Sequence, residues 1–278
     1  TSAPITFNGL VRHYDLRGGS NMADIQVNLV DKGERSIQSH GIAKLLRTEI
    51  QKIAAKYNAN VKLVEVPPGP PVLSTIVAEV YGPDYKTQID IANQVQTILK
   101  NTDDVVDIDW MVENDQTEYQ FEINKEKAML YGVAPQQIAY TMNMALSNNP
   151  ITNLYDEDAV NQVGLVLSLA EKEKSTISDI SQLKVKSKQG MMIPIADLVE
   201  IKETIADKSI FRKNQKRVVY VMADMAGELE SPAYAILGMG EKLEKIKLPE
   251  GYKLNEMYLG QPDFEDDYTV KWDGEWQI

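Results

Sequence analysis

Side chains that could carry covalent or metal chemistry are scarce in this 278-residue chain. The sequence contains no cysteine, which excludes disulfides, thiolate nucleophiles and Cys-bound zinc or iron–sulfur sites. It contains two histidines, His13 and His40, so His-rich metal sites and most Ser–His catalytic designs have little to build on. His13 lies in a polar stretch before Gly18-Gly19, and we interpret it as a surface residue.

Two groups of carboxylates are the candidate cation sites. The first contains Asp103, Asp104, Asp107 and Asp109, and the second contains Asp263, Glu265, Asp266 and Asp267. Because Asp107 and Asp109 alternate with apolar residues, we interpret them as the solvated face of a strand. The second group lacks the glycine and the ligand spacing of a calcium loop, so we interpret it as a solvated linker.

Methionine and glycine patterns give two weaker signals. The chain has 11 methionines, some in close pairs, and thioethers are ligands for soft metals such as Cu(I). Without cysteine or nearby histidine, we interpret these methionines as core filling.

Gly238-Met239-Gly240 lies inside a predicted helix and therefore does not form a dinucleotide loop. The sequence shows neither a phosphate loop nor a nucleophile elbow, and it predicts a protein that is not an enzyme and needs no cofactor.

Composition and charge set further limits. The 29 basic and 41 acidic residues give a net charge of −12, which disfavours binding to nucleic acid. The length suggests roughly two domains, and no stretch reaches the ~20 apolar residues of a membrane span. The chain starts Thr-Ser-Ala-Pro and ends abruptly after Trp272 and Trp276, two side chains suited to a membrane interface. We therefore expect a segment of a longer reading frame.

A strand–helix–strand unit is predicted three times along the chain. Its strands are Ile25–Leu29 with Val61–Val66, Ile76–Tyr81 with Val105–Val112, and Arg217–Ala223 with Tyr252–Tyr258. Ser36, Asp84 and Ser231-Pro232 are the predicted starts of the three helices. Pro67–Pro71 is the clearest linker. Repeated units of this kind predict an α+β fold with split βαβ, ferredoxin-like subdomains whose sheets carry helices on one face.

The stretch between the second and third units predicts an inserted α+β module. Its expected strands are Tyr119–Ile123, Val163–Leu169 and Leu183–Ser187, and its helix begins at Pro135. Gln189-Gly190 and Asn214-Gln215 are predicted turns.

Several short stretches occur in a characteristic order: Ser2–Gly9, Ala23–Leu29, Gly69-Pro70-Pro71, Gly82-Pro83, Phe121–Ala128, Tyr131-Gly132-Val133, Gly190–Leu198 and Leu248–Tyr252. Together they resemble the periplasmic region of resistance–nodulation–division (RND) efflux transporters of the acriflavine-resistance type, and specifically the second large periplasmic loop. The resemblance covers nearly the whole chain.

This resemblance implies a division into subdomains. Residues 1–66 would be the first porter subdomain, without its first strand and helix. Residues 72–113 and 217–260 would form the second porter subdomain, and residues 114–216 the inserted docking subdomain. Residues 261–278 would connect toward a membrane helix.

The resemblance also implies a function without covalent chemistry. Substrate would enter a cleft between the porter subdomains of a homotrimeric, proton-driven pump at the periplasmic face of the bacterial inner membrane. Periplasmic adaptor and outer-membrane channel proteins would be its partners. The loop Leu10–Asn21 would divide the cleft, and the predicted substrate contacts are Phe7, Leu10, Tyr14, Leu16, Leu63 and Val66. For Phe7 and Leu63, plain core packing is the competing interpretation.

Two alternatives stay open. The chain could be a stand-alone periplasmic binding or docking module built from the same units. Within the family, it could belong to a heavy-metal (copper or silver) exporter, which would need several thioether sulfurs at one point in the cleft. The cleft wall, residues 5–30 and 61–80, contains one methionine, Met22, so we expect hydrophobic small molecules as substrates and no Cu(I) or Ag(I) site.

Overall fold

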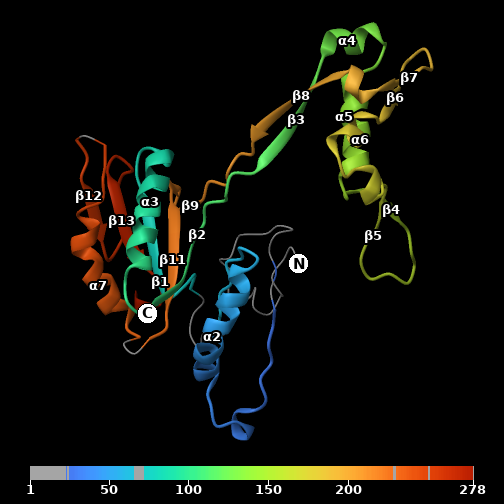
Figure 1. The fold of residues 1–278 in the computed structure, drawn as a ribbon. Helices are drawn as coiled ribbons and strands as arrows, with labels where there is room; N and C mark the ends of the chain where they lie inside the picture. Colours follow the sequence, from blue (N-terminus) through green and yellow to red (C-terminus); the bar gives the residue numbers. More distant parts are fainter. Residues whose placement is uncertain (1–22, 24, 66–71, 228–229, 250, 278) are drawn as a thin grey trace. The chain divides into compact units, whose positions relative to one another are not determined.

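The computed structural model describes residues 23, 25–65, 72–227, 230–249 and 251–277 (Figure 1). It divides into two compact units, one formed by Thr1–Asn114 with Lys208–Ile278 and the other by Asp115–Asp207. Its helices and small sheets form an α+β fold, as the sequence predicts.

A five-stranded sheet organises the first unit, in the order β12-β13-β1-β11-β2. The strands are β1 (Ile76–Tyr81), β2 (Val105–Trp110), β11 (Val219–Met225), β12 (Leu254–Met257) and β13 (Tyr268–Asp273). Neighbouring strands are antiparallel except β12 and β13, which are parallel. Val80 of the central strand β1 lies opposite Val219 on one side and Val270 on the other.

Helices α3 (Tyr85–Lys100) and α7 (Pro232–Leu243) pack on the same face of this sheet (Figure 1). Alternate residues of β1 and the apolar stripes of both helices share one buried cluster, whose members include Ile76, Ala78, Val80, Ile91, Val95, Leu99, Ile236, Met239, Leu243 and Trp272. Both predicted helix starts are confirmed. Asp84 accepts a hydrogen bond from the Thr87 N–H, and Pro232 follows Ser231 at the first turn of α7.

The opposite face of the sheet is covered partly by a short hairpin. Strands β9 (Arg212–Lys213) and β10 (Lys216–Arg217) flank Asn214 and Gln215, whose φ angles of 48° and 70° confirm the predicted turn. Beneath it, Phe211 and Tyr220 pack with a small buried cluster of Val77, Met111 and Met222.

The segment before the sheet differs from its prediction. It contains a short 3₁₀ turn, η1 (Lys32–Glu34), and helix α2 (Ser39–Ala55), which begins after Gln38 and not after Ser36. The predicted strand Ile25–Leu29 and the described part of Val61–Val66 form no strand. A strand is defined by backbone hydrogen bonds to a neighbouring strand, and neither stretch belongs to a sheet among the described residues.

The second unit is built from two-stranded sheets and short helices. Strand β3 (Thr117–Ile123) pairs with β8 (Val199–Ile205), β4 (Pro150–Leu154) with β5 (Val163–Val166), and β6 (Lys184–Lys186) with β7 (Met192–Pro194). The remaining elements are α4 (Lys125–Leu130), α5 (Pro135–Leu146), η2 (Glu171–Glu173), α6 (Ile177–Ser181) and η3 (Ile195–Asp197). Ala128, Ile138, Ile195 and Leu198 are fully buried in one core, and the turn at Gln189-Gly190 joins β6 to β7.

The end of the chain corrects two predictions. Residues 261–278 were expected to be a connection, yet β13 lies inside the sheet between β12 and β1, and η4 (Glu275–Gln277) follows it. Trp272 was expected at a membrane interface. Its side chain is fully buried, and its indole N–H donates to Glu256 Oε1 at 2.7 Å. Among the described residues, no helix combines the length and apolar character needed to cross a bilayer.

Candidate functional site

Of the six predicted substrate-contact residues, one lies among the described residues. Phe7, Leu10, Tyr14, Leu16 and Val66 lie outside the described residues, as does Met22. Leu63 is described and is half-buried, and its backbone N–H donates to Asp107 Oδ2 at 3.2 Å. The candidate site therefore consists of the contacts around Leu63.

Around Leu63, the segment that follows α2 is fastened to strand β2 by charge pairs. Arg47 of α2 donates to Asp107 Oδ1, and Lys62 donates to Asp109 Oδ2. The Asp107 side chain is completely buried, and that of Asp109 is 13% exposed. The prediction of a solvated strand face is therefore wrong for both carboxylates.

A β-bulge explains why the alternation was misleading. The register between β11 and β2 shifts between Met222 and Asp224, and Asp107 has a φ of 51° in the left-handed region. A bulge inserts a residue and turns its side chain away from the regular alternation, and aspartate tolerates this backbone conformation better than most residues. The bulge thereby aims Asp107 at the cation of Arg47.

A second set of charges joins the start of α2 to the segment before α7. The two ring nitrogens of His40 lie 2.7 Å from Glu65 Oε1 and 2.8 Å from Glu230 Oε1. Lys44 donates to the same Glu230 oxygen at 2.8 Å and to the Gly227 carbonyl at 2.7 Å. Hydrogen bonds from Lys44 and His40 lower the pKa of Glu230 to about 2, and the hydrogen bonds that Glu230 and Glu65 accept from the imidazole raise the pKa of His40 above its ordinary value.

The most deeply buried charges lie on the hairpin-covered face of the sheet. Glu79 of β1 is fully buried and contacts both Lys213 of the hairpin and Lys271 of β13. Both lysines also contact Asp273 Oδ2, at 2.6 Å and 2.8 Å, and the Tyr81 hydroxyl donates to Glu79 at 2.8 Å. Two carboxyl groups thus face two ammonium groups in this network.

Protonation within this network follows from burial and hydrogen bonding. Burial raises the pKa of the Glu79 carboxyl, and its hydrogen bond to Asp273 acts in the same direction. Burial would also raise the pKa of Asp273, but hydrogen bonds from Glu79, Lys213 and Lys271 outweigh it and hold that pKa well below its usual range. Burial raises the pKa of the Tyr220 hydroxyl to about 12. The arrangement can hold the hairpin on the sheet, and its groups are all engaged with one another.

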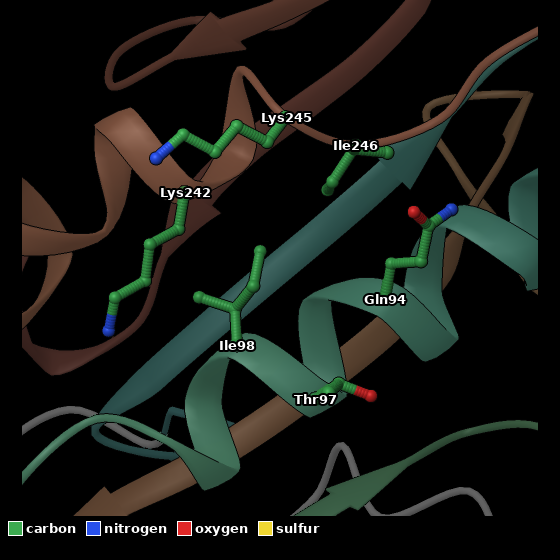
Figure 2. Close-up of a pocket in the computed structure, with 6 residues that line it drawn as sticks. All are labelled: Gln94, Thr97, Ile98, Lys242, Lys245 and Ile246. Atoms are coloured by element: carbon green, nitrogen blue, oxygen red, sulfur yellow. The ribbon is translucent and has the colours of Figure 1, made fainter.

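An open depression of about 240 Å³ lies on the helical side of the same sheet. Figure 2 shows Gln94, Thr97 and Ile98 of α3 on one side, and Lys242 of α7 with Lys245 and Ile246 on the other. Gln94 bridges the two sides, because its side chain accepts from the Lys247 N–H at 3.1 Å.

A metal ion would need several convergent His, Asp or Glu side chains. In the described part of the chain, no three His, Asp or Glu side chains gather in an arrangement that could hold a metal ion. The His40 group does not qualify because its two carboxylates lie on different ring nitrogens.

Comparison with known proteins identifies the family. A model of the AcrB/AcrD/AcrF family matches residues 2–262. The chain belongs to this family of RND efflux transporters, whose members are transporters and not enzymes.

The individual relatives are distant. The chain is 21% identical over 192 residues to the swarming motility protein SwrC of Bacillus subtilis, covering 68% of this chain and 18% of SwrC. It is 21% identical over 185 residues to the nickel and cobalt resistance protein CnrA of Cupriavidus metallidurans, covering 65% of this chain and 17% of CnrA. The chain thus spans less than a fifth of the length of these relatives.

A solved structure supports the fold. The crystal structure of a heavy metal efflux pump superposes with a TM-score of 0.60 at 14% identity, over 87% of this chain and 23% of that one. At this identity the likeness concerns the fold alone.

Sequence reasoning missed the charged network on the sheet. Its signal was present, because Lys271 and Asp273 are two residues apart in an otherwise apolar strand, and Glu79 occupies the corresponding face of β1. Charges at alternate positions of two apolar strands indicate a buried ion network when the strands are neighbours. That neighbour relation was not predicted, because β13 was interpreted as a linker.

Proposed function

We propose that this chain is the periplasmic porter and docking region of a proton-driven RND efflux pump. The observation that carries the proposal is the family match over residues 2–262. The α+β units and the likeness in fold to an efflux pump support it. In this proposal the chain lies at the periplasmic face of the inner membrane, within a homotrimer that contacts an adaptor protein and an outer-membrane channel.

The subdomain assignment is part of the proposal. Residues 1–66 are assigned to the first porter subdomain, and residues 72–113 with 217–260 to the second, to which we add β13. The docking subdomain is the inserted segment, predicted as 114–216. Residues 208–216, however, belong to the unit that contains the sheet: Lys213 bonds to Glu79 of β1, and Ser209 Oγ donates to Glu113 at 2.6 Å.

Hydrophobic organic molecules are the proposed substrates. The predicted contacts are apolar or aromatic, as is usual for sites that accept varied greasy ligands. Metal export is the second candidate, because the relative CnrA is named as a nickel and cobalt resistance protein.

Export assays with the complete transporter test the two candidates. The full reading frame is expressed in a bacterium that lacks its own pumps, and growth is measured with cationic dyes, detergents, Ni²⁺, Co²⁺ or Ag⁺. We expect several-fold higher tolerance to the organic compounds, reduced by Phe7→Ala and Leu63→Ala but unchanged by Leu45→Ala, whose side chain is exposed. If the transporter raised tolerance only to the metal ions, and Met22→Leu abolished the tolerance to Ag⁺, metal export would replace this proposal.

Binding by the isolated 278-residue chain tests the stand-alone alternative. We expect only weak binding of a hydrophobic fluorescent probe in a titration, because the proposed cleft requires parts outside this chain. Submicromolar binding would indicate a complete site and favour a stand-alone binding module.

A further inference from the structure

We propose that His40 is a pH-dependent clasp that links the start of α2 to Glu65 and Glu230 through both ring nitrogens when protonated, and that loses one of these two links when neutral. The contacts that suggest this are independent of the pump's substrate. They involve His40 and Lys44 of α2, Glu65 from the stretch after α2, and Glu230 from the stretch before α7. These are the charged groups facing the imidazole in the described part of the chain.

The hydrogen-bond geometry requires a charged imidazole. Nδ1 lies 2.7 Å from a Glu65 carboxylate oxygen, and Nε2 lies 2.8 Å from a Glu230 carboxylate oxygen. Ionised carboxylates only accept hydrogen bonds, so both ring nitrogens must donate, and only the imidazolium form can do so. Loss of the proton leaves one nitrogen lone pair facing a carboxylate, so one of the two links breaks.

The remaining contacts confine the change to one end of the helix. Arg47 and Lys62 bind Asp107 and Asp109 on β2, and these contacts do not involve His40. Lys44 keeps its hydrogen bonds to Glu230 and to the Gly227 carbonyl. Deprotonation therefore loosens the first turn of α2 while its middle stays attached to the sheet.

The sign of the pH dependence follows from the two carboxylates. Their hydrogen bonds raise the pKa of His40 in the folded chain above the ordinary value of 6.5. The contribution of the clasp is then complete below that ordinary value and is lost as pH rises through the higher folded value. The clasp has both links in acid and loses one of them in mild alkali.

Histidine titration by NMR is the first test. The chain has two histidines, so His13→Gln assigns both ring signals. We expect the His40 pKa to exceed the ordinary value, and Glu230→Gln and Glu65→Gln each to lower it. A His40 pKa at or below the ordinary value, or one unchanged by both substitutions, would overturn the proposal.

Spin-label distances test the movement itself, and the absence of native cysteine makes labelling specific. Labels at Gln38→Cys and Asn93→Cys report the start of α2, and labels at Thr48→Cys and Asn93→Cys report its anchored middle. When the pH is raised from about 5 to about 9, which spans the usual titration range of histidine, the distance distribution of the first label pair should broaden or shift to longer distances. The distance between the second pair of labels should change little. His40→Gln should abolish the difference, and Lys44→Gln should enlarge it. Equal distances at both pH values, or a pH effect that survives His40→Gln, would refute the clasp.

Discussion

Helices α2 and α3 carry similar amphipathic patterns, yet they bury very different amounts of apolar surface. Ile91, Val95 and Leu99 of α3 are completely buried against the five-stranded sheet. In α2 the one fully buried residue is Ala54, while Leu45 is 68% exposed and Ile53 is 57% exposed. Periodicity specifies which face of a helix is apolar, but burial depends on whether another element lies against that face.

Helices α2 and α3 are also held on the rest of their unit by different kinds of contact. Helix α3 is held by apolar packing, whereas α2 is joined to β2 and to the segment before α7 by charged side chains, namely His40, Lys44 and Arg47. Substitutions of the same kind in both helices can separate these two modes of attachment.

The largest difference is expected from truncating a leucine in each helix. Leu99→Ala should lower the free energy of unfolding by about 3 kcal/mol, because it removes buried methyl groups and leaves a cavity. Leu45→Ala should change it by less than about 0.5 kcal/mol, because the side chain is already in solvent. Urea denaturation measures both. Equal losses would mean that the apolar face of α2 is buried.

Removal of the Arg47 cation should have the next largest effect. Arg47→Met leaves the fully buried carboxylate of Asp107 with the Leu63 N–H and no cation, at a cost of about 2 kcal/mol. Hydrogen exchange should accelerate in α2 and stay slow in β1. Lys52→Met, which removes an exposed ion pair with Glu49, is the matched control and should leave the stability and the hydrogen exchange of α2 and β1 unchanged.

Helix capping should give the smallest of these effects. Asp84→Ala removes the hydrogen bond to the Thr87 N–H and should cost about 1 kcal/mol. Ser231→Ala in α7 should cost almost nothing, because the Ser231 side chain makes no cap hydrogen bond.

The Asp84 cap should also depend on pH in a defined direction. Hydrogen bonds from Thr87 lower the pKa of Asp84, so its contribution is present above the ordinary aspartate value and is lost as pH falls through the lower folded value. Denaturation curves of the natural chain and of Asp84→Ala should therefore converge in acid. A gap that persists at the lowest pH would indicate that the cap does not act through the ionised carboxylate.

Local signals made much of the sheet and its helices predictable. The apolar run Ile76–Tyr81, the cap at Asp84 and the Ser231-Pro232 start are each set by neighbouring residues, and all three occur in the structure. What could not be predicted depends on distant partners. Ile25–Leu29 has a strand pattern without a described neighbour, and Asp107 leaves its alternation because a bulge forms against β11. Of the predicted site, Leu63 is described, and its contact with Asp107 depends on that bulge.

The position of β13 has a consequence for the order of folding. This strand comes last among the strands of the described residues, yet it pairs with β1 on one side and with β12 on the other. During synthesis, β1 and β11 can pair early, but the gap beside β1 is filled only when residues 268–273 have left the ribosome. The unit formed by Asp115–Asp207 is continuous in sequence and can fold while the sheet is still incomplete. Closure of the sheet requires contacts between residues as distant in sequence as Val80 and Val270, and such long-range contacts form slowly.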